Sequence, residues 1–427
     1  MKLDRTTPPQ VNDFGHLNIP LPRTTMLQNG IVLHVIDAGT VPVNNIFVSW
    51  NRGEADVDSP AALNLMMSCL TEGTSRLSGA EIADIFESNG SWIKFGTSLH
   101  QSFVTAYSLN SNVKEIIPVL IDIITDPVFD NEVFEIKKNK YITEKKIKLE
   151  KVLYQAALGA IELNYGKNHP FAVEESPEEI ELIKRDTAVR LHNDIIATYP
   201  PVIYLSGLID NQLLDFIIES FSKLHFKQPA SPYKVVERNQ APAGSVACKS
   251  MPDKKQSAIK IIIPTIPLDH PDYLPLQIVV TALGGYFGSR LVTNIREEKG
   301  YTYGITARLL SLKEGCSVSI TWECDNCYVD AVIDETKKEL TRLATEPMDE
   351  SELRTVVSYI KSSLASCLDN AFSLKEYFQS LFIVDKAPSE FYELQEILQK
   401  ITPDDIQNIA CKHLNPDKML VSIAGNC

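Results

Sequence analysis

An arginine and a tyrosine stand on either side of a glycine in the second half of the chain. Arg296 lies near the end of a predicted helix over residues 289–299, Gly300 is typical of a helix C-terminal cap, and Tyr303 begins a predicted strand. A guanidinium at a helix end and a phenol at the next strand's start can reach one point in space. They would donate hydrogen bonds to a peptide carbonyl or a developing oxyanion. The alternative is a surface arginine beside a packed tyrosine.

Cysteines and glycines offer weaker candidates. Cys324 and Cys327 form a Cys-x-x-Cys pair that could act in redox or metal chemistry. No second pair follows at zinc-finger spacing, which favours a structural role. The eight cysteines do not resemble a disulfide framework, so a reducing compartment is expected. The glycines at 284, 285 and 288 could cradle an anion at a helix start, but a tight turn between helices is the favoured interpretation.

The histidines do not predict a helix-borne metal site. They stand at positions 16, 34, 100, 169, 192, 225, 270 and 413, and no two have the four-residue spacing that puts both on one helix face. A site assembled from scattered histidines is the remaining route to a metal. The sequence also lacks a Gly-x-Ser-x-Gly elbow, a phosphate loop and a dinucleotide-binding glycine motif.

Composition limits the class of protein. With 427 residues, the chain is too long for one ordinary core, and 44% hydrophobic and 22% charged residues are typical of a globular protein. The net charge of −14 argues against nucleic-acid binding. No apolar run has membrane-spanning length, and the first residues lack a signal core. The expected location is cytoplasmic, or periplasmic if a leader has been removed.

The predicted elements occur in the same order twice. After an extended arm over residues 1–25, strands at 31–36 and 45–50 precede helices at 60–70 and 78–89 and strands at 92–99 and 101–108. Residues 258–322 repeat this order, and segments 121–135 and 199–207 resemble 340–354 and 414–425. Two copies of a roughly 200-residue α+β unit explain the pattern. The predicted domains are 1–226 and 245–427, joined by a proline-bearing linker over 227–244.

With this organisation, the Arg296/Tyr303 segment makes the chain resemble the M16 metallopeptidases, the insulinase-like or pitrilysin-like family that includes mitochondrial processing peptidase. The resemblance runs from Asn29 to Gly425, and its most specific part is residues 284–303. It implies an α+β fold of two homologous repeats, each an antiparallel-rich sheet packed with helices, as in the LuxS/MPP-like metallohydrolases. It also implies that Arg296 and Tyr303 contact substrate near the scissile bond.

The resemblance includes a zinc site that this chain does not keep. The family's site is a His-x-x-Glu-His helix, in which two histidines bind the metal and the glutamate polarises a water. In the corresponding helix here, Asn64 and Ser68 replace the histidines and Met67 replaces the base. The third ligand position best matches Glu144, although a shift of one residue would place Lys145 there. We therefore expect no metal at these degenerate positions, and no cofactor bound by this chain.

These expectations define three functions. In the first, the chain is a non-catalytic subunit, inactive alone, that forms a heterodimer with a His-x-x-Glu-His-bearing M16 subunit. It would offer Arg296 and Tyr303 to an unfolded peptide at the partner's zinc site. In the second, it is a catalytically dead scaffold that binds proteins. The third, a self-sufficient peptidase with an unconventional metal site, is the least favoured. No membrane partner is expected.

Overall fold

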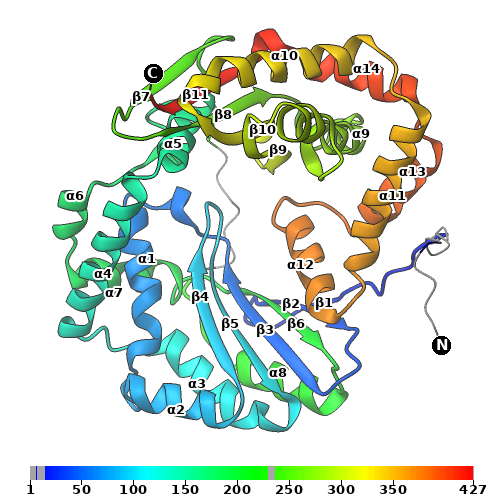
Figure 1. Ribbon diagram of the computed structural model, residues 1–427. Coiled ribbons are helices and arrows are strands. Elements are labelled where there is room, and N and C mark those ends of the chain that lie inside the picture. Colours follow the sequence, from blue (N-terminus) through cyan, green and yellow to red (C-terminus); the bar gives the residue numbers. More distant parts are fainter. Residues whose placement is uncertain (1–5, 7–14, 229–235, 427) are drawn as a thin grey trace.

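A computed structural model describes residue 6 and residues 15–228 and 236–426. Parts of the predicted arm (1–25) and of the predicted linker (227–244) therefore lie outside the described residues, as does the last residue. The described chain forms two lobes, each built around one sheet with helices packed on it (Figure 1). Among these residues, no helix combines the length and the apolar character needed to cross a membrane.

The two sheets have the same topology. The first has the strand order β1-β2-β6-β3-β5-β4 and the second the order β7-β11-β8-β10-β9. The strands are β1 (Arg23–Met26), β2 (Val32–Asp37), β3 (Val43–Trp50), β4 (Trp92–Thr97), β5 (Ser102–Leu109), β6 (Val202–Gly207), β7 (Val246–Ser250), β8 (Gln256–Pro264), β9 (Thr302–Leu312), β10 (Gly315–Asp325) and β11 (Leu420–Gly425).

Strands β2 to β6 correspond one by one to β7 to β11. In each sheet the first and last of the five pair in parallel, and every other pair is antiparallel. The predicted α+β fold of two homologous repeats is therefore confirmed. The sequence did not predict β1, which extends the first sheet, or β7, which lies in the polar stretch after the linker.

The helices follow the repeat as well. Those of the first half are α1 (Pro60–Cys69), α2 (Gly79–Ser88), α3 (Val113–Thr125), α4 (Asn131–Leu149), α5 (Val152–Tyr165), α6 (Pro177–Glu181), α7 (Arg185–Ile195) and α8 (Asn211–Ser222). Those of the second half are α9 (Tyr273–Val280), α10 (Val329–Thr345), α11 (Glu350–Ser366), α12 (Ala371–Phe382), α13 (Glu390–Lys400) and α14 (Pro403–His413). Two π-helical segments, η5 (Thr281–Gly285) and η6 (Val292–Glu298), follow α9.

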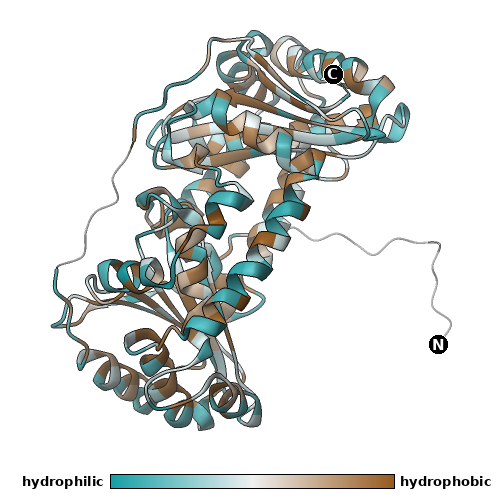
Figure 2. Cartoon of the chain, turned by 90° about the vertical axis from the view of Figure 1, so that its left-hand side faces the viewer, coloured by the Kyte–Doolittle hydropathy of each residue, from teal (hydrophilic) through white to brown (hydrophobic). Residues whose placement is uncertain are grey.

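Both faces of each sheet are apolar. Successive strand side chains point to opposite faces, so Leu33 and Val35 of β2 pack against the helices of the first half while Ile36 joins a different core. Tyr204 of β6 and Phe47 of β3 belong to that second core too. Figure 2 shows the hydrophobic colour concentrated on the strands and the inner helix faces, with hydrophilic residues on outer faces. Each sheet therefore needs helices on both sides.

In each sheet, the helix that covers the second face comes from the other half of the chain. Helix α5, from the first half, packs on β7, β8 and β11 of the second sheet (Figure 1). Its small residues permit a close approach: Ala156 and Ala160 are buried, and a Cβ added to Gly159 would lie 2.4 Å from Ser422 Oγ. Opposite them, Ala258 completes a small core with Ala156. The halves therefore exchange helices across the predicted domain boundary.

Helix α12, from the second half, packs in a corresponding way on the first sheet. The Phe382 ring stacks on buried His34 with centroids 4.5 Å apart, and His34 stacks in turn on Tyr204 at 4.9 Å. The buried ammonium of Lys375 lies 4.8 Å from the centre of the Phe47 ring. Thr24 of β1 bonds to His34 Nδ1 at 2.8 Å. An aromatic core around one histidine therefore joins the lobes.

The described end of the predicted linker is fixed to this framework. The Asn239 and Ala241 amides donate to the carbonyls of Tyr165 and Leu163 at 2.9 Å each, so the chain runs beside the end of α5. The guanidinium of Arg238 lies 5.0 Å from the centre of the Tyr165 ring and donates to the Gly315 carbonyl. Residues 236–244 thus strengthen the contact between α5 and the second sheet.

We expect the stability of the protein to depend on pH through His34. Burial lowers the pKa of His34 from 6.5 to about 4. The folded protein binds this proton more weakly than the unfolded chain, so unfolding takes up a proton between these pH values. The stabilisation is fully present above about pH 6.5 and is lost as the pH falls towards 4, by up to about 3 kcal/mol.

Urea unfolding of the wild type, His34→Phe and the exposed-site control His225→Gln, measured from pH 7.5 to 4.5, tests this. The His34→Phe variant should lose stability less steeply with falling pH, while His225→Gln should follow the wild type. Parallel pH curves for all three proteins would contradict the assignment.

Candidate functional site

The degenerate zinc positions lie on α1, whose start is fixed by Ser59 as N-cap and Pro60 at the first position. Met67 is buried in the core of the first half, so its thioether cannot serve as a base. Ser68 is half-buried, and its hydroxyl donates to the Leu65 carbonyl at 2.8 Å. Both side chains therefore make their contacts within the protein.

Asn64 belongs to a hydrogen-bonded cluster at the same face. Its amide nitrogen donates to Glu54 Oε1 at 3.1 Å, and its amide oxygen accepts from the Thr97 hydroxyl at 3.0 Å. The Thr97 hydroxyl also lies 2.6 Å from Glu54 Oε1. These contacts join α1 to the edge strand β4 and to the 3₁₀ turn at Glu54–Asp56.

Helix α4 turns a lysine towards this cluster. Lys145 is buried and its ammonium lies 2.5 Å from Glu174 Oε1 and 3.2 Å from the Tyr154 hydroxyl, whereas Glu144 is exposed. The Tyr154 hydroxyl also donates to Glu174 at 2.9 Å. Of the two alignments left open by the sequence, the alternative Lys145 is the buried residue and Glu144 faces solvent, and the assignment of the third ligand position stays a prediction.

This charge pattern opposes metal binding. An ammonium cannot ligate a cation, and it occupies the part of the site from which the third ligand would have come. Burial raises the pKa of Tyr141 to about 12, and burial together with the Glu174 carboxylate raises that of Tyr154 further. Both phenols therefore stay protonated at neutral pH. The residues near α1 hold structure through hydrogen bonds, and among the described residues no group of three possible metal ligands gathers there.

Arg296 lies on the π-helix η6, which is fixed at several points. At its start, Arg290 forms a bidentate pair with Glu352 of α11 at 2.7 and 3.0 Å. At its end, Lys299 pairs with Glu335 of α10 at 2.8 Å, and this pair, with Lys338, lowers the pKa of Glu335 to about 2. The predicted helix over 289–299 is confirmed, but in π geometry, which frequently marks functional sites.

The Arg296 side chain contacts the backbone of Tyr303, and the convergence of its guanidinium with the Tyr303 phenol stays a prediction. Arg296 Nε donates to the Tyr303 carbonyl at 2.9 Å, and Nη1 pairs with Glu297 at 2.7 Å. The Tyr303 side chain is 91% exposed. Gly300 adopts the positive φ of a helix cap, at +66°. A half-buried guanidinium therefore contacts the backbone at the beginning of edge strand β9, where Tyr303 exposes its phenol.

Phe287 completes this surface and was not predicted. Its ring is 68% exposed and lies 4.7 Å from the Arg296 guanidinium carbon. A phenylalanine between Gly285 and Gly288 could have signalled a displayed side chain. The glycines themselves serve packing: a Cβ on Gly284 would lie 2.7 Å from the backbone nitrogen of Ala307 in β9. The favoured interpretation of a tight turn is supported for Gly284.

The Cys-x-x-Cys pair lacks the features of a redox site. Cys324 is buried on β10, and burial raises its pKa to about 11. Cys327 is exposed, and Asp325 raises its pKa. Both are free thiols that stay protonated, which disfavours nucleophilic chemistry. Cys248 of β7 is disulfide-bonded, which the sequence did not predict.

Known proteins resemble this chain in sequence and fold. Residues 201–359 match the family model described as "Peptidase M16 inactive domain". The chain is 20% identical to the mitochondrial-processing peptidase subunit beta of Neurospora crassa, over 95% of this chain and 88% of that protein. It is 21% identical to the uncharacterized zinc protease YmxG of Bacillus subtilis, over 71% of this chain and 73% of that protein.

A solved structure has nearly the same architecture. The crystal structure of a peptidase M16 inactive domain from Pseudomonas fluorescens superposes with a TM-score of 0.86 at 20% identity, covering 95% of this chain and 98% of that one. This likeness supports the fold described above, with its two sheets and packed helices.

We expect Lys145→Ala to destabilise the fold without changing its metal content. The substitution leaves Glu174 and Tyr154 without their buried cation, which costs about 1–3 kcal/mol. Lys223→Ala, which removes an exposed pair with Glu219, is the control and should cost under about 1 kcal/mol. Denaturant unfolding with the double variant Lys145→Ala/Glu174→Gln measures the coupling. Equal, small losses for both lysines would contradict this role.

Proposed function

Because this chain belongs to the M16 peptidase family, we propose that it is the non-catalytic subunit of a two-chain zinc peptidase. Its Arg296 and Tyr303 would contact a peptide held at the zinc site of a partner bearing the His-x-x-Glu-His helix. One contrast carries the proposal: the chain keeps a displayed Arg296/Tyr303 pair but has Asn64, Ser68 and Lys145 at the ligand positions. The Neurospora relative is itself named as a subunit.

In this proposal, the two chains together would supply the groups needed for peptide-bond hydrolysis. The partner would supply the metal, the activated water and the glutamate base. This chain would supply hydrogen-bond donors to the carbonyl oxygen as negative charge develops on it. Arg296 already has its guanidinium fixed by the Tyr303 carbonyl and the Phe287 ring, so little ordering is needed on binding. Zinc is therefore expected in the partner, and the unfolded peptide would lie between the two chains.

A catalytically dead scaffold is the second candidate. The Lys145–Glu174 ion pair near α1 disfavours metal binding there. This is equally compatible with a scaffold and with a heterodimer subunit. The exposed Tyr303 argues for a subunit, because a scaffold gains nothing in stability from a phenol that is 91% exposed. The following experiment separates these functions.

We expect Arg296→Ala and Tyr303→Phe each to lower kcat by about 10²-fold in an active complex, as loss of an oxyanion donor does. The chain would be co-purified with a zinc-bearing M16 chain and assayed on a peptide library. Arg354→Ala, which removes a 74%-exposed arginine of α11, is the matched control and should leave kcat unchanged. Thermal unfolding would verify that each variant is folded.

Three outcomes decide between the functions. Activity only in the complex, with both variants impaired, supports the subunit. Full activity of both variants, or no active complex, favours the scaffold. Hydrolysis by the isolated chain with zinc bound near α1 would overturn both.

A further inference from the structure

Two histidines and an aspartate converge far from α1, where α9 begins and α14 ends. His270 and Asp272 flank Pro271 in the turn that opens α9, and His413 is the last residue of α14. One ligand atom from each of these three side chains lies within 4.8 Å of those from the other two, and all three are partly buried. No other group of at least three His, Cys, Asp or Glu side chains among the described residues could hold a metal ion in this way.

We propose that His270, Asp272 and His413 form a binding site for a divalent transition-metal ion of the zinc class. Two imidazoles and one carboxylate are a ligand set that such ions accept, with bonds of about 2.0–2.2 Å. In tetrahedral coordination, ligand atoms bound to one ion at that length lie about 3.4 Å apart, so atoms that are now up to 4.8 Å apart would move together by up to about 1.4 Å when the ion binds. This inference is independent of the proposed peptidase role.

The three side chains already contact one another. His413 Nε2 lies 2.8 Å from Asp272 Oδ2, a hydrogen bond that a bound ion would replace with two bonds to the metal. His270 Nδ1 accepts the Asp272 backbone N–H at 3.0 Å, so a metal would either replace this hydrogen bond or bind the ring through Nε2. The two imidazole rings meet edge to face, with centroids 5.5 Å apart. Pro271 restricts the backbone between the first two ligands.

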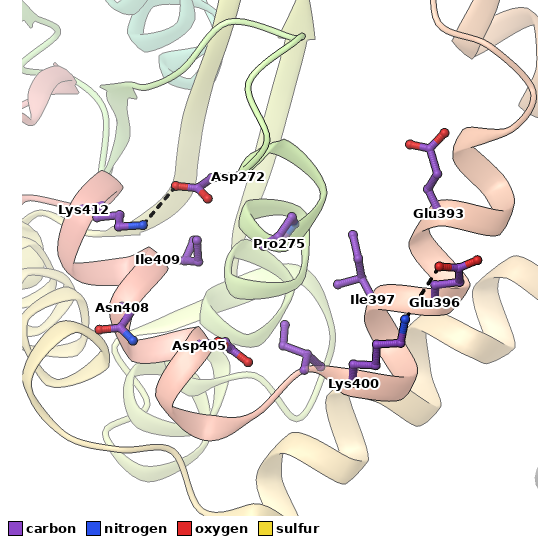
Figure 3. A pocket seen from close by; sticks show the side chains of 11 residues that line it. Asp272, Pro275, Glu393, Glu396, Ile397, Lys400, Asp405, Asn408, Ile409 and Lys412 are labelled. Atoms are coloured by element: carbon purple, nitrogen blue, oxygen red, sulfur yellow. Dashed lines mark ion pairs between the residues drawn. The ribbon is translucent and has the colours of Figure 1, made fainter.

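A lysine competes with the metal for the carboxylate. Lys412 Nζ lies 3.5 Å from Asp272 Oδ2, and the lysine side chain is 60% exposed, so it can turn into solvent when a cation binds. Figure 3 shows this pair on one side of an open groove of about 820 Å³, across from Glu393 and Lys400 of α13. The carboxylate lines the groove, which gives an ion from solvent a route to it.

Bound metal would tie the start of α9 to the end of α14. These two helices pack together, and α14 also packs on α10, which anchors the Arg296 helix through Glu335. Three protein ligands leave at least one coordination position for water. The site would therefore stabilise the second lobe, and it would add zinc to a chain whose α1 site is degenerate.

Titration of the tag-free chain with Zn²⁺ and Co²⁺ tests the site. We expect one saturable equivalent in calorimetry, a visible Co²⁺ absorption band, and a rise in Tm of at least about 2 °C at saturating metal. His270→Ala and His413→Ala should each weaken binding by at least about tenfold, since even residues that only orient a ligand have effects of this size. Lys412→Ala should strengthen binding, because it removes the competing cation.

His225→Ala, at an exposed histidine outside the site, is the control and should bind as the wild type does. Tm measured in EDTA establishes that each variant is folded before metal is added. No saturable equivalent, or equal binding by the wild type and both ligand variants, would overturn the proposal. Hydrolysis by a reconstituted complex carrying His413→Ala should be unaffected, which separates this site from the proposed function.

Discussion

The reciprocal exchange of α5 and α12 is the constraint on which the rest of the structure depends. Each sheet is apolar on both faces, and neither half of the chain covers both faces of its own sheet. Helix α5 closes the second sheet through its small side chains, and α12 closes the first through the rings around His34. The relative placement of the α1 region and the Arg296 surface is therefore fixed by core packing, and residues 236–244 reinforce it through their bonds to α5 and to Gly315.

The two halves carry different polar groups on this common framework. Near α1, the Lys145 ammonium and the Tyr154 phenol are bound by the Glu174 carboxylate, and the Asn64 amide is bound by Glu54 and Thr97. Near η6, the side chains that need no metal are held at the surface by ion pairs to α10 and α11. Under the proposed function, the first repeat would lack metal chemistry and the second would offer donors to a substrate; the two are compatible, because the core beneath each site does not depend on the polar groups of the other.

The sequence predicted best those features that depend only on neighbouring residues, such as helix periodicity, caps and turns. Periodicity, caps and the acidic-Pro turns were enough to predict the repeat, and the glycine at 300 correctly marked the end of the helix that carries Arg296. Lys145 is buried and Glu144 is exposed, and no local pattern in the sequence reports this difference between two neighbouring helical positions. The exchange of α5 and α12 could not be predicted either. An apolar helix face shows that the helix packs on something, but it does not identify which of the two sheets it covers. His270, Asp272 and His413 were missed because they approach one another only through the packing of α9 on α14.

The exchanged helices also impose an order on biosynthesis. The first sheet is complete when β6 emerges at residue 207, but its second face stays uncovered until α12 ends at residue 382. At translation speeds of about 5–20 residues per second, the aromatic face around Tyr204 waits for roughly 10–35 s. Throughout that interval the nascent first half exposes this apolar face, which can associate with other nascent chains on the same polysome. The order in which the chain is made therefore leaves the first half with an aggregation-prone apolar face until a helix encoded about 175 residues later covers it.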